Sequence, residues 1–165
     1  MVLYFGYKIR TKKGIMTKKI IKIITLFIIP FLFYIPVSNG AEIIANSSLF
    51  QGTISKRELR SIFSLRLKQW RTGERIIVVT YSDATSVGKT FHANFCKDAL
   101  GVFPHQLQQA WDRSIYSGTG VPPKKVDTLE QMLDFIAKTK GAIGYVDGGI
   151  VDVDAVDGVK IINVD

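Results

Sequence analysis

Nine residues near the middle of the chain combine hydroxyl groups with a lysine, and they follow a strongly apolar segment. The apolar segment is residues 75–81 (RIIVVTY), and residues 82–90 read SDATSVGKT. Hydroxyl groups and the free amides at the start of a helix donate hydrogen bonds to oxyanions, and the helix start adds partial positive charge. We therefore interpret this stretch as a candidate site for a small oxyanion such as phosphate or sulfate, with contacts from Ser82, Asp83, Thr85, Ser86, Gly88, Lys89 and Thr90.

Two residues of this stretch bear on the identity of the ion. An ionised Asp83 would accept a hydrogen bond from a protonated oxygen, which favours hydrogen phosphate over sulfate. Lys89 would add a positive charge if its side chain points back toward the turn. The same stretch also suits ordinary helix capping by Thr85 or Ser86, with the other hydroxyl groups in solvent. The sequence leaves both interpretations open.

Other kinds of chemistry find little support in the sequence. Residues 88–90 (GKT) resemble the end of a nucleotide-binding P-loop, but the first glycine of that motif would fall at position 83, which is Asp83. His92 and His105 lack the spacing of metal ligands, and we expect His92 on a helix surface. A calcium loop does not fit the spacing of the four C-terminal aspartates, Asp147, Asp152, Asp154 and Asp157. We therefore expect a binding protein that is not an enzyme, with no metal and no cofactor.

The elements that would position the candidate site alternate between strands and helices. Residues 75–81 are rich in β-branched side chains, which is typical of a strand buried on both faces. Helix starts are indicated by Ser55 with Glu58, by Thr128 with Gln131, and by Pro104. Further strands are expected at residues 42–45, 142–146 and 159–164, and the helix after the hydroxyl-rich stretch should bury Val87, Phe91 and Phe95.

This alternation predicts the α/β class, with a mainly parallel sheet flanked by helices. Ligands of such sheets bind at the carboxyl ends of the strands, which here is the turn after Tyr81. Cys96 is the single cysteine, so no internal disulfide can form, and its apolar helical surroundings predict a buried side chain. The domain must therefore be stabilised by packing.

The N-terminal 40 residues have the order of a secretory signal peptide. Lysines precede the apolar residues 20–37, and small residues follow up to Gly40, with Met16 as a better-proportioned start. Retention of this segment as a membrane anchor is the alternative, although Pro30 and Pro36 interrupt it. We expect residues 1–40 to be removed on export to the periplasm, leaving one domain at residues 41–165 that is secreted, or membrane-anchored if the leader is retained.

The export segment also changes what the charge of the chain implies. The whole chain carries a formal charge of +8, and seven cations but no acidic residue precede position 40. Removal of those seven charges from +8 leaves +1. A nucleic-acid partner is therefore not expected, because the basic residues serve orientation at the membrane.

Several segments together resemble phosphate ABC transporter substrate-binding proteins. The resemblance extends from Ser47 to Val164, and GAIGYV at residues 141–146 is its sharpest element. The other matching segments are residues 55–63 (SKRELRSIF), 70–73 (WRTG), 76–79 (IIVV) and 118–123 (GTGVPP), with Phe91 and Trp111.

The resemblance implies the type II periplasmic-binding-protein fold, of which this chain would supply a single lobe. It also implies phosphate as the ligand and a transporter protein as a partner. The family's arginine-containing phosphate loop is matched here only by Ser82 and Asp83, with Tyr81 in place of the arginine. An ion on one open lobe stays partly hydrated, so we expect weak binding. The alternative function is an envelope protein–protein interaction module that has lost the ion site.

Overall fold

A computed structural model describes residues 40–49, 52–149 and 152–165. One compact unit spans Asn39–Asp165. The predicted signal peptide, residues 1–40, lies almost wholly outside the described residues. Within the described ranges, no helix is both long enough and apolar enough to cross a membrane.

The described residues form a five-stranded sheet with the order β3-β2-β4-β1-β5. The strands are β1 (Ala41–Asn46), β2 (Ile77–Tyr81), β3 (Lys124–Val126), β4 (Ala142–Asp147) and β5 (Val159–Ile162). β2 runs parallel to β3 and to β4, whereas β1 lies antiparallel to both β4 and β5. Four of the five strands therefore run in one direction, and the predicted α/β class is confirmed with β1 as the reversed strand.

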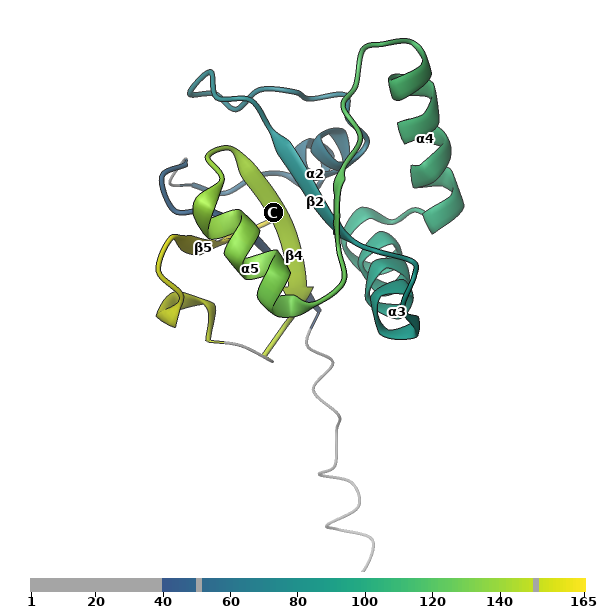
Figure 1. The fold of residues 1–165 in the computed structure, drawn as a ribbon. Coiled ribbons are helices and arrows are strands. Elements are labelled where there is room, and N and C mark those ends of the chain that lie inside the picture. The colour runs from purple at the N-terminus through teal and green to yellow at the C-terminus, as the bar shows by residue number, and fades with distance from the viewer. Residues whose placement is uncertain (1–39, 50–51, 150–151) are drawn as a thin grey trace, which may run out of the picture. The chain divides into compact units, whose positions relative to one another are not determined.

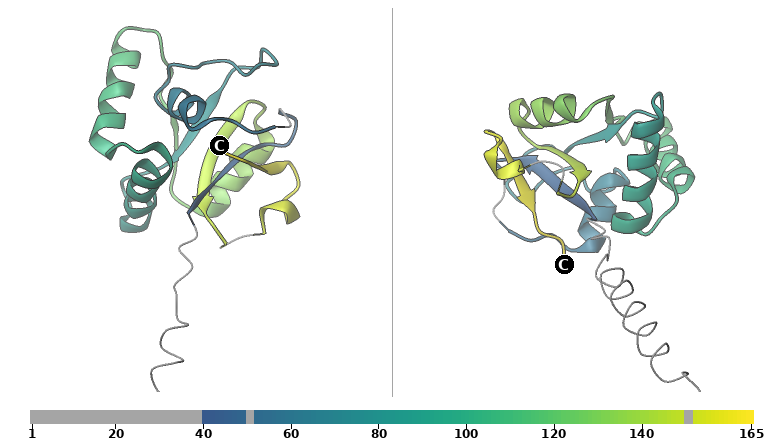
Figure 2. Two further views of the ribbon diagram at one scale, coloured as in Figure 1. Left: turned by 180° about the vertical axis from the view of Figure 1, so that it is seen from behind. Right: turned by 90° about the horizontal axis from the view of Figure 1, so that it is seen from below.

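Helices cover both faces of this sheet (Figures 1 and 2). The elements are α2 (Lys56–Phe63), α3 (Ser86–Phe95), a π-helical turn η1 (Cys96–Leu100), α4 (Pro104–Tyr116), α5 (Leu129–Lys138) and a short 3-10 turn η2 (Val153–Ala155). Figure 1 shows α5 on the near face of β4, and the view from behind in Figure 2 shows α2 on the opposite face.

Alternation along β4 explains how both faces are packed. A Cβ atom at Gly144 would lie 2.6 Å from Sδ of Met132 and 2.8 Å from Cδ1 of Ile136, so the missing side chain lets α5 approach the strand closely. The next residue, Tyr145, points to the other face. There its ring stacks on Phe95 of α3, with centroids 3.7 Å apart.

The helix starts follow the local signals of the sequence. Ser55 accepts a hydrogen bond from the Glu58 amide, and the Glu58 carboxylate accepts one from the Ser55 amide, which completes a capping box. Thr128 caps α5 by accepting from the Gln131 amide at 3.3 Å. Pro104 begins α4. The predicted capping residues therefore place α2, α4 and α5.

Two elements differ from expectation. β3 was not predicted; it consists of three residues, two of them exposed lysines, and it forms by pairing with β2. The final strand was expected to reach Val164 but ends at Ile162, and Val164 instead makes an isolated bridge with Ile54.

Candidate functional site

The hydroxyl-rich stretch lies at the carboxyl edge of the parallel part of the sheet. It connects the end of β2 to the start of α3, and β2 lies between β3 and β4. The Ser82 amide donates to the Val126 carbonyl at 2.8 Å, and the Asp83 carboxylate lies 3.7 Å from Nζ of Lys125. These two contacts hold the β2–α3 loop against the end of β3, at the edge of the sheet that the sequence predicts for a ligand.

Three hydroxyl groups of residues 82–90 already take part in local hydrogen bonds. Thr85 is the N-cap of α3 and accepts from the Gly88 amide at 3.0 Å. Ser82 Oγ accepts from the Ala84 amide at 3.2 Å, and Thr90 Oγ1 donates to the Ser86 carbonyl at 2.9 Å. Ser82 and Thr85 accept in these bonds, so each keeps its own hydroxyl hydrogen as a donor. The hydroxyl hydrogen of Thr90 is already used in its bond to the Ser86 carbonyl.

The first two amides of α3 remain uncommitted. Ser86 and Val87 open the helix, where backbone amides have no acceptor within the helix itself. The side chain of the N-cap residue Thr85 accepts from the Gly88 amide and not from these two. Within the described part of the chain, neither amide has another acceptor. Ser86 and Lys89 are exposed beside them. The helix start therefore offers two backbone donors, a hydroxyl group and an ammonium group to solvent.

Gly88 has a packing role at the base of this loop. A Cβ atom at this position would lie 2.5 Å from the Ser82 carbonyl oxygen and 2.8 Å from Oγ1 of Thr85. Real Cβ atoms do not approach backbone oxygens this closely. The glycine therefore lets the loop fold back over the first turn of α3, which fixes the direction of the Ser86 and Val87 amides.

Carboxylates of α5 and of β4 also act on this edge. Burial raises the pKa of Tyr81 to about 12, and the negative charges of Glu130 and Asp147 contribute to the same shift. Asp83 adds a third carboxylate, which the exposed ammonium group of Lys125 faces at 3.7 Å. An anion that binds here therefore meets negative charge, which favours a ligand able to donate a proton to a carboxylate over a fully ionised one.

A buried polar cluster lies behind the loop. Oγ1 of Thr80 is 3.0 Å from the Tyr145 hydroxyl and 3.1 Å from Nδ1 of His92, and the Tyr145 hydroxyl is 2.9 Å from the same nitrogen. Cys96 Sγ lies 3.6 Å from Nε2 of His92. The four side chains are all buried, so they are satisfied by one another and do not face a ligand.

The environment keeps this cluster neutral. Burial lowers the pKa of His92 and raises the pKa of the Cys96 thiol to about 12. Burial also raises the pKa of Tyr145. The Cys96 thiol is therefore protonated and unreactive at neutral pH, in agreement with its predicted buried position.

The predicted surface position of His92 is wrong. Its side chain is 5 % exposed, whereas Val87, expected in the buried stripe of the same helix, is 60 % exposed. Phe95 is buried as expected, and the other buried residues of α3 and η1 are Gly88, His92, Cys96 and Leu100. Histidine is only of intermediate burial among residue types, so its identity did not mark position 92 as part of the buried face.

Two of the C-terminal aspartates lie at the surface, and three of the aromatic side chains lie in the core. Among the described residues, no group of three or more His, Cys, Asp or Glu side chains could hold a metal ion. Asp152 and Asp157 are exposed, as expected of solvated turn residues. Phe63, Trp70 and Trp111 are buried in the core.

Comparison with known proteins relates the chain to one group of solved structures. No family model and no curated protein matches the sequence. Three similar structures are an ABC-type phosphate transport receptor from Vibrio cholerae, a protein from Clostridium perfringens described as a phosphate ABC transporter substrate-binding protein and solved with bound phosphate, and PstS from Borrelia burgdorferi.

The agreement with these structures concerns the fold. The TM-scores are 0.53, 0.54 and 0.54, at sequence identities of 18 %, 17 % and 12 % respectively. The alignments cover 76 % of this chain and 46 %, 44 % and 47 % of the three structures, so the chain spans less than half of their length, as expected of a single lobe. The resemblance read from the sequence is thereby confirmed at the level of the fold, which this chain shares with phosphate ABC transporter substrate-binding proteins.

Proposed function

We propose that this protein is an exported, solute-binding-like domain whose β2–α3 loop binds a small oxyanion, with phosphate as the preferred ion. The observation that carries the proposal is the pair of uncommitted amides at Ser86 and Val87, placed at the carboxyl edge of parallel strands. The shared fold supports it, since one similar structure was solved with phosphate bound. A link to phosphate ABC transport, with a transporter protein as partner, belongs to the same proposal.

In the proposed complex, each group of the loop has a separate task. The amides of Ser86 and Val87 donate to one oxygen of the ion, and the hydroxyl groups of Thr85 and Ser86 donate to others. Ser82 and Gly88 shape the turn, and Thr90 supports the first helical turn through its bond to the Ser86 carbonyl. Lys89 supplies positive charge from the exposed face of α3.

Asp83 sets the selectivity of the proposed site. Hydrogen phosphate carries a proton that it can donate to the Asp83 carboxylate, whereas sulfate has none at neutral pH and is repelled. The ion pair between Asp83 and Lys125 is exposed, so it competes only weakly with such a contact. Because the loop is open to solvent, the ion stays partly hydrated and the affinity is low.

Calorimetric titration of the purified protein with phosphate and with sulfate tests the proposal. We expect heat of binding with phosphate and little with sulfate. The Asp83→Asn variant should bring the two affinities closer together, because it removes the charge that repels sulfate. Absence of heat with both ions on folded protein would count against an oxyanion site.

Export and the absence of catalysis are parts of the same proposal. The similar structures are binding proteins of phosphate transport, which supports a binding role outside the cytoplasm. The signal peptide at residues 1–40 would direct export to the periplasm. Mass determination of the protein recovered from the cell envelope should give a chain that begins near Ala41; a retained leader would indicate membrane anchoring.

An envelope interaction module is the second candidate function. It is favoured by the internal hydrogen bonds of Ser82, Thr85 and Thr90, and by exposed apolar side chains such as Tyr116 (90 % exposed) and Val121 (55 %). Light scattering with and without candidate envelope proteins separates the two functions. Complex formation without any response to phosphate would support the interaction module.

A further inference from the structure

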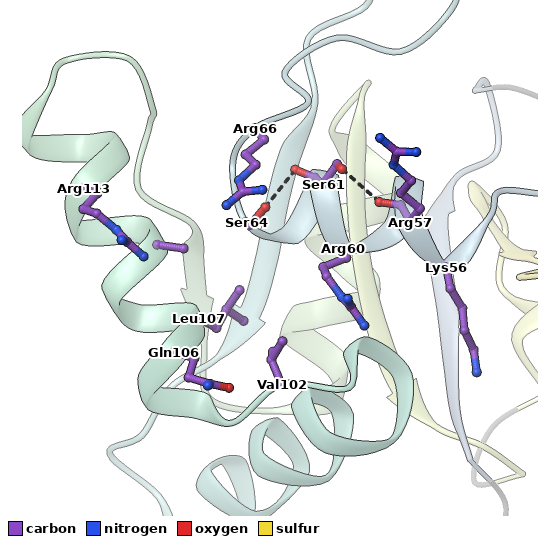
Figure 3. Close-up of a pocket in the computed structure, with 11 residues that line it drawn as sticks. Lys56, Arg57, Arg60, Ser61, Ser64, Arg66, Val102, Gln106, Leu107 and Arg113 are labelled. Carbon is purple, nitrogen blue, oxygen red and sulfur yellow. Dashed lines mark hydrogen bonds between the residues drawn. The ribbon is translucent and has the colours of Figure 1, made fainter.

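A cavity with strongly basic walls lies between α2 and α4, away from the β2–α3 loop (Figure 3). Its volume is about 630 Å³. Among the residues that the structure describes, no carboxylate and no residue of the β2–α3 loop lines it. Its lining includes five cationic side chains, Lys56, Arg57, Arg60, Arg66 and Arg113.

Three arginines surround the space between the two helices. Figure 3 shows Arg113 on α4 at one side of this space, Arg66 beside Ser64 in the segment after α2, and Arg60 extending from α2 toward the η1 turn. We call the cavity between them the basic groove. The guanidinium of Arg57 points the other way from that of Arg60, so Arg57 belongs to the rim.

Two of the three guanidinium groups are held in place through only one of their nitrogens. Nε of Arg60 donates to the Leu100 carbonyl at 2.8 Å, and Nε of Arg113 donates to the Gln109 carbonyl at 3.2 Å. In the described parts of the chain, none of the three arginines forms an ion pair with a carboxylate. The terminal nitrogens of all three arginines therefore offer paired donors to a ligand, and the side-chain directions of Arg60 and Arg113 are already set by these bonds.

The other lining groups add donors and an apolar wall. Gln106 Oε1 accepts from the Phe103 amide at 2.9 Å, which leaves its NH₂ group to donate. The hydroxyl groups of Ser61 and Ser64 donate to the carbonyls of Arg57 and Ser61, respectively, so they do not add donors for a ligand. The side chains of Val102 and Leu107 supply apolar surface beside the arginines.

These properties identify the chemistry of a ligand. The planar guanidinium matches two oxygens of a phosphate at once, and arginine cannot lose its charge at neutral pH. Arginines on both walls of a cavity in the size range of small-molecule sites can each engage a separate phosphate group. We propose that the basic groove binds a ligand with two or more phosphate groups, independently of the oxyanion site at the β2–α3 loop.

Such a ligand can be a soluble polyphosphate ester or the headgroup of a lipid with two phosphates, and the experiment separates these sources. The protein is titrated with tripolyphosphate by calorimetry, and it is sedimented with vesicles of phosphatidylcholine and cardiolipin. Binding of tripolyphosphate alone indicates a soluble ligand, and co-sedimentation in addition indicates a lipid source; both support the proposal. Failure of both, or binding of poly-glutamate but not of tripolyphosphate, would overturn it.

Variants assign any observed binding to the groove. Arg66→Gln with Arg113→Gln should weaken tripolyphosphate binding at least tenfold, because each lost charged hydrogen bond costs about one order of magnitude in affinity. Arg66→Gln alone serves if the double variant is unstable, since the Arg66 side chain makes no hydrogen bond within the described chain. Lys138→Gln on α5 removes one positive charge, as Arg66→Gln alone does, at a residue outside the groove's lining, and it should leave binding unchanged.

Failure of the groove proposal can be distinguished from failure of the oxyanion site at the β2–α3 loop. Arg66→Gln with Arg113→Gln should leave the response of the Ser86 and Val87 amides to inorganic phosphate unchanged, because neither arginine belongs to the β2–α3 loop. Binding by the double variant as tight as that of the parent protein would contradict the assignment to the basic groove. Tripolyphosphate binding should also weaken as salt increases, as expected of contacts between charged groups.

Discussion

The Tyr145 hydroxyl lies 2.9 Å from Nδ1 of His92, which joins strand β4 to helix α3 inside the protein. Thr80 at the end of β2 completes the cluster, 3.0 Å from the same hydroxyl. Thr80 precedes the β2–α3 loop by two positions, and His92 lies one helical turn after Gly88. The cluster therefore fixes both ends of the loop that we propose as the oxyanion site.

Removal of the Tyr145 hydroxyl should destabilise the protein. Tyr145→Phe keeps the ring stacked on Phe95 but leaves Thr80 and His92 without a shared partner in a site closed to water. We expect a loss of about 1–3 kcal/mol in the free energy of unfolding, measured by chemical denaturation. Tyr116→Phe is the matched control, because that side chain is 90 % exposed, and it should leave stability unchanged. Equal stability of both variants would mean that the Tyr145 hydroxyl contributes nothing to the free energy of unfolding.

Acidification should reduce stability through His92. Burial lowers the pKa of His92 in the folded protein below its ordinary value of about 6.5, so the unfolded chain binds the proton more readily. The stability is therefore fully present above about pH 6.5 and falls as the pH is lowered toward the folded-state pKa.

Denaturation curves between neutral and mildly acidic pH measure this dependence. His92→Gln should remove the part of the decline that belongs to the imidazole, whereas His105→Gln, on the exposed surface of α4, should retain the parent profile. An unchanged pH profile in His92→Gln would show that another group causes the decline.

Replacement of Gly88 should displace the β2–α3 loop, because the glycine packs against the Ser82 carbonyl. In Gly88→Ala, the new methyl group would meet the Ser82 carbonyl at 2.5 Å, so the loop or the first turn of α3 must move. We expect destabilisation of about 1–3 kcal/mol and weaker phosphate binding, because the amides of Ser86 and Val87 shift with the helix. Asn94→Ala, at an exposed position of the same helix, should retain both stability and binding.

Local signals of the sequence predict much of the fold. The Ser55–Glu58 capping box, Pro104 and Thr128 mark helix starts because capping depends on neighbours within a few residues. The β-branched run before the loop predicts β2 for the same kind of reason. The placement of the candidate loop at the carboxyl edge of the sheet follows from these elements together.

Features that depend on distant residues could not be predicted in this way. His92 is buried because Tyr145, 53 positions later, provides its hydrogen-bond partner. β3 exists because β2 provides its pairing edge, since its own sequence is mostly lysine. The basic groove joins Arg60 and Arg66 to Arg113 across two helices, and no local pattern connects these positions.

The most direct test of the oxyanion site is a residue-by-residue record of the backbone amides during a phosphate titration, by NMR of the isotope-labelled protein. Our account predicts that the amide signals of Ser86 and Val87 move most and saturate with phosphate. Sulfate should move them much less. Unmoved signals at these two residues, or shifts confined to the segments around Arg60 and Arg113, would contradict an oxyanion site at the start of α3.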